Sequence, residues 1–174
     1  MAKQVIRPTG RESPFNDDEI IVSKTDLKGH LTYTNDVFLR VSGYSAAEII
    51  GKPHSIIRHP DMPRCVFKML WDTIQAKGEI FAYVVNLASN GDHYWVLAHV
   101  TPSFDASGNV VGYHSNRRKP DPEKLQKIIP LYADLLKREG EVANRKDGMH
   151  KGHEFMMNIL KSKGVEYDEF VLTL

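Results

Sequence analysis

A short loop holds the residue types best suited to binding an anion. It reads Arg58-His59-Pro60-Asp61 and comes just before a strongly amphipathic segment. A guanidinium offers fork-shaped donors to a phosphate, and the N-terminus of a helix attracts the same charge. The two prolines of the string HPDMP stiffen this loop, which lowers the entropy cost of ordering it around a ligand. On these residues alone, a helix-entry loop with Asp61 as the cap and Arg58 in a surface ion pair is the favoured interpretation.

A second candidate is an amide in the middle of an apolar strand. Asn86 lies within residues 80–87, which are rich in aromatic and β-branched side chains, and asparagine is disfavoured at such a position. An amide offers both a donor and an acceptor, as the polar edge of a planar heterocycle requires. Asn90, by contrast, is explained by the hairpin turn that it forms with Gly91. Asn86 is therefore the stronger binding candidate.

The composition excludes several classes of protein. Of 174 residues, 41% are hydrophobic and 26% are charged, and 23 basic residues against 22 acidic ones leave no field that would attract nucleic acid. Cys65 is the single cysteine and cannot form an internal disulfide. The first residues lack the apolar core of a signal peptide, and no apolar stretch approaches the ~20 residues of a membrane span. We therefore expect a cytoplasmic protein that does not insert into the membrane.

The segments that must position these residues differ in the spacing of their hydrophobic residues, which is typical of strands in some segments and of helices in others. Strands are predicted near residues 20–22, 31–34, 80–87, 93–104 and 110–118, with turn residues between them. Short helical turns are predicted at 35–43 and 45–48 and a stronger helix at 63–77, with Asn35 and Asp61 as caps. Residues 1–19 are polar and are predicted to form a loose arm. The pattern predicts an α+β domain at residues 20–119.

The remaining residues, 120–174, are predicted to form a helical extension. An apolar stripe at near-heptad spacing runs through residues 125–136, and Pro130 inside it is expected to kink or restart the helix. A last helix is predicted near 149–163, with Gly164 at its end, and the tail after it is expected to dock or pair. The stripe suits either packing against its own domain or contact with a partner helix, and its spacing does not decide between these interpretations.

Several strings resemble one family closely. TDLKGHLTYTND, VSGYSAAEIIGKPHSIIRHPDMP, NGDHYWV, VGYHSNRR and IIPLY, spread over residues 18–136, resemble the PAS sensory domains, in particular the FAD-binding PAS domains of bacterial aerotaxis and energy-taxis receptors. RHPDMP followed by NGDHYW is much more specific than the general PAS pattern. The resemblance implies a five-stranded antiparallel sheet with short helices over one face and FAD held non-covalently between them.

The resemblance also implies a set of cofactor-binding residues. By position these are Asn35, His54, Arg58, His59, Asp61 and Asn86, while Phe81 or its neighbour Ile80 falls near a tryptophan that lines the pocket in the membrane-bound receptors. His54 lies in the region that carries the reactive cysteine of LOV photosensors, so blue-light adduct chemistry is not expected. Cys65 is then a small packing residue. No metal site is predicted, because His54, His59 and Asp61 lack a recognised zinc-ligand spacing.

The resemblance implies a sensor rather than an enzyme. We expect the chain to pass the redox state of its FAD to a membrane-bound chemoreceptor or another signalling protein and to form a homodimer. Because it stops after a short extension, it resembles the soluble half of a bipartite energy-taxis system. Three alternatives remain: a haem-binding gas sensor using His59, His99 or His114, a cofactor-free interaction module, and a flavoenzyme, for which no nucleophile–base pair is visible.

Overall fold

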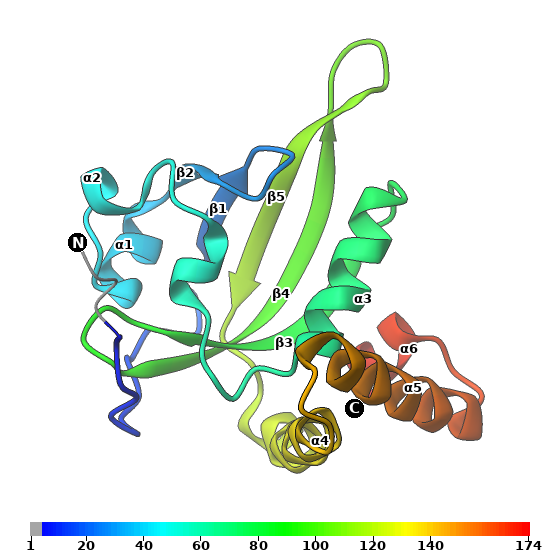
Figure 1. Ribbon diagram of the computed structural model, residues 1–174. Coiled ribbons are helices and arrows are strands. Elements are labelled where there is room, and N and C mark those ends of the chain that lie inside the picture. Colours follow the sequence, from blue (N-terminus) through cyan, green and yellow to red (C-terminus); the bar gives the residue numbers. More distant parts are fainter. Residues whose placement is uncertain (1–4) are drawn as a thin grey trace.

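Strict alternation of inward and outward side chains builds one antiparallel sheet. The computed structural model describes residues 5–174. The sheet has the order β2-β1-β5-β4-β3 (Figure 1). Its strands are β1 (Ile21–Thr25), β2 (Leu31–Thr34), β3 (Ile80–Leu87), β4 (His93–Phe104) and β5 (Val110–Arg118). The predicted five-stranded antiparallel sheet is confirmed, and β3, β4 and β5 have the predicted bounds.

Short helices and one longer helix cover the inner face of this sheet. They are α1 (Asp36–Ser42), α2 (Ala46–Ile49), the 3₁₀ helix η1 (His54–Ile57) and α3 (Arg64–Gln75). The side chain of Asn35 caps α1 as predicted, because its Oδ1 accepts a hydrogen bond from the backbone N–H of Phe38 at 3.0 Å. The prediction that Asp61 caps α3 is wrong. Helix α3 begins after Pro63, and its first N–H groups bond a carboxylate from a distant segment, described below.

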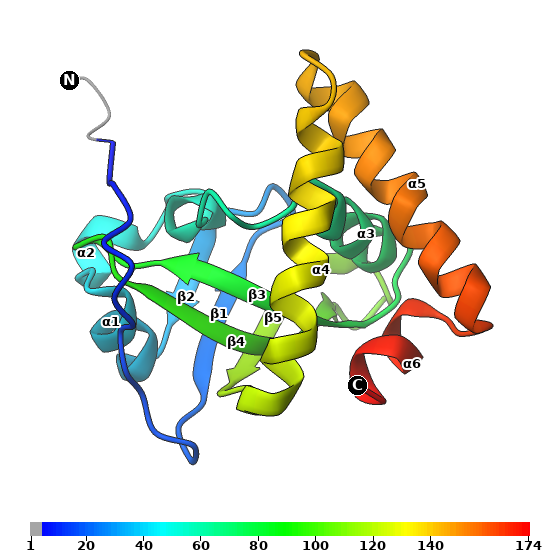
Figure 2. The ribbon, with the colours of Figure 1, turned by 90° about the horizontal axis from the view of Figure 1, so that it is seen from below.

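The extension forms three helices that fold back on the domain. They are α4 (Pro122–Gly140), α5 (Arg145–Lys163) and α6 (Tyr167–Leu172) (Figure 2). The apolar stripe of α4 packs against the outer face of the sheet, where Tyr132 contacts Trp95 and its hydroxyl donates to the carbonyl of Tyr83. The tail docks through α6, since Asp168 Oδ1 accepts from the backbone N–H of Phe81 at 3.1 Å. The stripe is therefore buried within its own chain.

Helix α4 continues without interruption through Pro130, so the expected restart is wrong. A proline removes one backbone hydrogen bond and leaves the carbonyl one turn earlier without its partner. Pro130 and Gln126, whose carbonyl lies one turn earlier, are on the exposed side of α4, while Ile128 and Tyr132 anchor the helix on its buried side. The packing of α4 thus outweighs the local cost of the proline.

The N-terminal arm is ordered over its described part, residues 5–19, which contradicts the predicted loose arm; residues 1–4 of that prediction lie outside the described residues. The arm is hydrogen-bonded to the turn between β3 and β4. The N–H of Thr9 donates to the carbonyl of Gly91 at 2.8 Å, and His93 exchanges backbone hydrogen bonds with Arg11 and Ser13. Asp92 in the same turn also accepts hydrogen bonds from the side chains of Thr9 and Arg11. These partners lie about 80 residues apart in the chain, so local composition does not predict the pairing.

Replacing Gly91 with alanine is expected to release this arm. Gly91 has φ +91°, and a Cβ built on it would lie 2.3 Å from the carbonyl oxygen of Arg7. We expect a loss of ~2 kcal/mol or more in the free energy of unfolding, measured by urea denaturation. Gly108→Ala is the matched control, because Gly108 also has positive φ but nothing within 4 Å of its Cβ position. Equal losses in the two variants would show that the arm contributes nothing.

Within residues 5–174, no helix is both long enough and apolar enough to cross a membrane.

Candidate functional site

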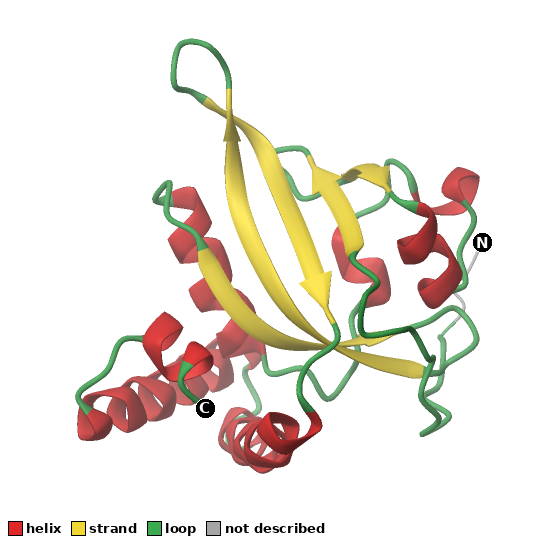
Figure 3. Ribbon diagram, turned by 180° about the vertical axis from the view of Figure 1, so that it is seen from behind, coloured by secondary structure: helices red, strands yellow, loops and turns green. Residues whose placement is uncertain are grey.

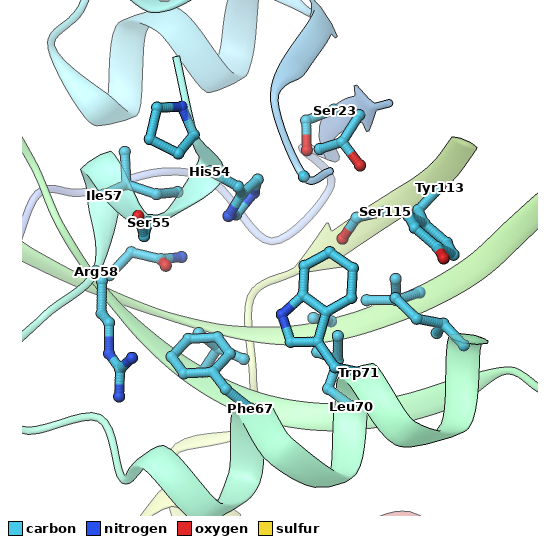
Figure 4. Close-up of a pocket in the computed structure, with 18 of the residues that line it drawn as sticks. Ser23, His54, Ser55, Ile57, Arg58, Phe67, Leu70, Trp71, Tyr113 and Ser115 are labelled. Atoms are coloured by element: carbon cyan, nitrogen blue, oxygen red, sulfur yellow. The ribbon is translucent and has the colours of Figure 1, made fainter. Parts of the chain in front are cut away.

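A cavity of about 600 Å³ lies between the inner face of the sheet, η1 and α3 (Figure 4). Its size falls within the usual range for small-molecule sites. Apolar and aromatic side chains form most of its walls: Ile57, Phe67, Leu70, Trp71, Val84, Ala98, Val100 and Tyr113. Phe67 and Trp71 are four residues apart on α3 and so lie on the same side of the helix, facing the sheet. The walls suit a flat, largely apolar ligand.

Polar groups from alternate strand positions converge on this cavity. Ser115 and Arg117 follow Tyr113 at intervals of two along β5, so all three point to the inner face. Asn86 reaches the same face from β3, and Ser23 from β1. The sheet therefore supplies a polar floor beneath aromatic walls.

Three of these polar side chains each have one atom that finds no hydrogen-bond partner anywhere in residues 5–174. The atoms are Asn86 Nδ2, Ser115 Oγ and Arg117 Nη1, and each is fully buried. Tyr94, directly opposite Asn86 in the register of β3 and β4, also has a buried hydroxyl without a partner in the described chain. An unsatisfied buried polar group costs ~1–3 kcal/mol, so folded proteins rarely keep several together. The cluster indicates a ligand whose polar edge satisfies these groups.

Arg117 is the strongest electrostatic feature of the cavity. It is 3% exposed, and its Nη2 donates to Ser23 Oγ at 2.8 Å and to Nε2 of His54. Burial lowers the pKa of the guanidinium to about 10, which still leaves it charged at neutral pH. Among residues 5–174 no carboxylate forms an ion pair with it. A buried cation with a free N–H favours an anionic or strongly polarised acceptor on the ligand.

His54 is held neutral beside this cation. Burial, and then the charge of Arg117, lower the pKa of His54 to about 3. The neutral ring can accept the hydrogen bond from Arg117 at its Nε2. His54 thereby fixes the position of the guanidinium at the floor of the cavity.

The low pKa of His54 makes the protein less stable in acid. Between about pH 3 and pH 6.5 the unfolded chain binds a proton at His54 that the folded chain does not, so stability falls as the pH drops through this window. The slope is at most ~1.4 kcal/mol per pH unit. His54→Gln, which keeps an acceptor, is expected to reduce the loss of stability between pH 7 and pH 4 by up to ~3 kcal/mol in urea denaturation. His150→Gln, on the exposed side of α5, is the control; identical pH profiles for His54→Gln and the wild type would contradict the assignment.

Four basic residues line the cavity on the side formed by loops and helix α3: Lys28, Arg58, Arg64 and Lys68. The guanidinium of Arg58 lies over the ring of Phe67, 4.6 Å from its centroid, and its Nη2 donates to the carbonyl of Met62 at 3.3 Å. A backbone bridge also joins Arg58 to Asn86 on β3. We call Arg58, Arg64 and Lys68 the basic end of the cavity.

The structure brings three of the seven predicted binding residues to the cavity: His54, Arg58 and Asn86. Asn35 does not line it, because its side chain is fully engaged with the backbone of Ile20, Val22 and Phe38. Phe81 lies on the outer face of β3, stacked on His99 with 4.2 Å between ring centroids.

His59 and Asp61 lie in the loop beside the cavity rather than in its wall. His59 is buried, and its Nδ1 accepts from the backbone N–H of Asp61 at 3.1 Å, while its ring contacts that of His93. The side chain of Asp61 is 77% exposed. Both residues shape the loop that carries Arg58.

Of the histidines named for haem, His99 bonds Glu79 on the outer face, and His114 borders the cavity but bonds Asn116, the alternate residue of β5 that faces away from the inner side. Within the described residues, no three His, Cys, Asp or Glu side chains gather as a metal site would require.

Trp71, Ser115 and Arg117 line the cavity but were not among the predicted binding residues. Trp71 lines the cavity, whereas the resemblance implies a pocket tryptophan position near Ile80 or Phe81. A signal for Trp71 was present, because Phe67 and Trp71 form a second apolar stripe beside the main stripe of α3. Arg117 was also detectable, since it occupies an inward position in the alternation of β5.

Comparisons with known proteins agree with this architecture. The profile of the PAS fold family matches residues 31–117. The aerotaxis receptor of Escherichia coli K12 is 40% identical over 145 residues, which are 83% of this chain and 27% of that protein. The nitrogen fixation regulatory protein of Klebsiella pneumoniae is 26% identical over 99 residues, 57% of this chain and 20% of that one. The chain thus spans about a quarter or less of the length of these relatives.

Solved structures show the same fold. The dark-state structure of the blue-light photoreceptor Aureochrome1 LOV has a TM-score of 0.56 and 24% identity, and the match covers 66% of this chain and 85% of that one. A structural genomics PAS domain from Colwellia psychrerythraea has a TM-score of 0.54 and 20% identity, over 58% and 86% of the two chains. On its sequence profile and its sheet with inner-face helices, this chain belongs to the PAS fold family.

Proposed function

We propose that this chain is a sensory module that binds a flavin, FAD in particular, non-covalently in the cavity and passes its redox state to a signalling partner. The observation that carries the proposal is the group of buried, unpartnered atoms of Asn86, Ser115 and Arg117 on one floor of an aromatic-walled cavity. Two similarities support it: a relative is named an aerotaxis receptor, and one solved structure of this fold is titled for a flavin analogue in a light-oxygen-voltage domain.

The residues present fit the chemistry of a flavin. When bound, a flavin supplies a reversible redox couple in which reduction adds a proton at ring atom N5 and increases negative charge along the pyrimidine edge. Arg117 Nη1 would donate to an acceptor on that edge, and its positive charge would favour the reduced form. The Asn86 amide can present either its oxygen or its NH₂ to a neighbouring ring nitrogen by rotating. The guanidinium groups of Arg58 and Arg64 would hold phosphates at the basic end.

Asn86 lies where a rotation of its side chain can affect other parts of the chain. Its backbone is bridged to Arg58, and α6 is bonded to the free edge of the same strand, where the backbone N–H of Phe81 donates to Asp168. A change in the preferred amide orientation would alter β3 and the helices docked on it. Such a signal is a population shift and needs no turnover. We further propose a membrane-bound chemoreceptor as the partner and a homodimer as the working unit.

The visible absorption spectrum of the purified protein, before and after dithionite, tests the proposal. We expect two flavin bands that bleach on reduction and return in air. A single intense Soret band would overturn the flavin assignment in favour of haem. A protein that stays colourless and binds no added FAD would favour a cofactor-free interaction module.

A further inference from the structure

A buried carboxylate joins the C-terminal extension to the wall of the cavity. Glu139 of α4 is 4% exposed, and its Oε2 and Oε1 accept the backbone N–H groups of Arg64 at 3.0 Å and Cys65 at 2.8 Å. These are the first two residues of α3, whose N–H groups have no partner within the helix. A negative charge at a helix N-terminus is also favourable. Glu139 therefore fixes the start of α3 from 74 residues away in the chain.

Two glycines let α5 lie directly on this carboxylate. A Cβ at Gly148 would lie 2.1 Å from the carbonyl oxygen of Glu139, and one at Gly152 would lie 2.8 Å from Glu139 Cγ and 3.2 Å from Cys65 Sγ. The two glycines are four residues apart and so share one face of α5. Each costs ~0.5–1 kcal/mol of helix stability relative to alanine, so close packing is the feature that they serve.

The same hairpin of α4 and α5 reaches the basic end of the cavity. Met149 of α5 lines the cavity together with Arg64 and Arg58. Burial lowers the pKa of Arg58, and charges from three helices act on it: Arg64 and Arg145 lower it further, while Glu139 raises it. Residues of α3, α4 and α5 thus converge where phosphates would bind. Figure 2 shows α4 and α5 side by side next to α3.

We propose that the α4–α5 hairpin is a specificity element of the cofactor cavity, which selects a flavin with a dinucleotide tail over flavin mononucleotide and riboflavin. This inference rests on the proposed flavin site. Phosphate charge is common to the mono- and dinucleotide, so Arg58 and Arg64 alone do not separate them. The dinucleotide adds an aromatic base, and the α5 side chain at the basic end is Met149, whose thioether contacts aromatic rings favourably.

The arrangement also couples the cofactor to the extension. If docking of the hairpin raises the affinity for the dinucleotide by some factor, then binding of the dinucleotide must strengthen docking by the same factor. The hairpin is held by Glu139 and by the glycine contacts, and it touches the cavity through Met149. Binding of the dinucleotide in the cavity therefore strengthens the docking of α4 and α5 on the domain.

The test compares the dissociation constants of FAD, flavin mononucleotide and riboflavin, measured by flavin fluorescence. Gly152→Ala pushes α5 away from Glu139, and we expect it to weaken FAD binding by ~10-fold while changing riboflavin binding less than about 2-fold. Gly140→Ala is the matched control, because a Cβ there meets nothing within 4 Å. Met149→Ala, which leaves the Glu139 contacts intact, is expected to weaken FAD binding by ~3-fold and flavin mononucleotide binding less.

Hydrogen exchange of α5 is the second readout, and FAD is expected to slow it in the wild type more than riboflavin does. If Gly152→Ala does not fold, Met149→Ala and the exchange data decide. The inference would be overturned if the variants kept the wild-type ratios of the three dissociation constants and FAD did not change hydrogen exchange in α5. The proposed flavin site would be unaffected by that result. A wild-type protein that binds none of the three flavins would overturn both.

Discussion

Replacing Arg117 with methionine is expected to weaken FAD binding by ~10- to 100-fold while leaving the cofactor-free protein as stable as the wild type or more so. A hydrogen bond to a charged group contributes ~1.5–3 kcal/mol, which corresponds to that loss of affinity. In the absence of ligand the guanidinium is buried with only Ser23 and His54 as hydrogen-bond partners and no carboxylate bonded to it in the described chain. Exchanging an unpaired buried charge for a well-packed apolar side chain is often neutral or stabilising.

The two effects have opposite signs, which separates a binding residue from a structural one. Thermal unfolding of the cofactor-free protein and a fluorescence titration with FAD measure them. Arg118→Met is the control, because Arg118 is the next residue of β5 and is exposed. A variant that loses stability and affinity together would show that Arg117 supports the fold. Unchanged affinity would remove Arg117 from the site.

Replacing Asn86 with leucine is expected to abolish the response to reduction while the flavin stays bound. Asn86 is 2% exposed and its Nδ2 has no partner among residues 5–174, so an apolar side chain of similar size should raise the stability of the cofactor-free protein by ~1 kcal/mol. The amide that follows the protonation of the ring is then gone. Asn86 also lies on the strand whose free edge is bonded to α6.

Hydrogen exchange in α4 to α6, compared between the oxidised and the reduced protein, measures this response. We expect a difference in the wild type and none in Asn86→Leu. Asn116→Leu on β5 is the control, because Asn116 is not part of the cavity wall and bonds His114 instead. If Asn86→Leu showed the same exchange difference between the oxidised and reduced protein as the wild type, the Asn86 amide would not be the group that responds to reduction.

The sheet was predictable because its signals are local. Alternation over residues 80–87, 93–104 and 110–118 and the Asn90-Gly91 turn are each contained in a few neighbouring residues, and the observed strands have these bounds. Figure 3 shows these three long strands from behind, with α4 beside them. The helix at 63–77 was located for the same reason, to within one residue at its start and two at its end.

The features that escaped prediction depend on contacts between distant segments. The cap of α3 comes from Glu139, so the nearby Asp61 was a reasonable but wrong candidate. The arm pairs with the turn at Gly91 and Asp92, which is about 80 residues away in the chain, so local composition does not predict it. The apolar stripe of α4 was visible, but a stripe does not reveal that its partner is the outer face of the chain's own sheet.

The candidate site was predictable in part. His54, Arg58 and Asn86, which the resemblance implies as binding residues, line the cavity, whereas Phe81 points to the outer face because side chains alternate along β3. The same alternation, applied to β5, identifies Arg117 as an inward-facing cation. The strand period alone therefore places Phe81 outside the cavity and Arg117 inside it.

The crystal structure of the protein with FAD tests the central claim most directly, namely that the unpartnered groups of the sheet hold a flavin. We predict that the pyrimidine edge of the ring lies within hydrogen-bond distance of Arg117 Nη1 and that the Asn86 amide contacts the ring. We also predict that the phosphates lie at the basic end beside Arg58 and Arg64. A ring bound elsewhere, or a cavity in which Arg117 and Asn86 still lack a ligand partner, would contradict the account.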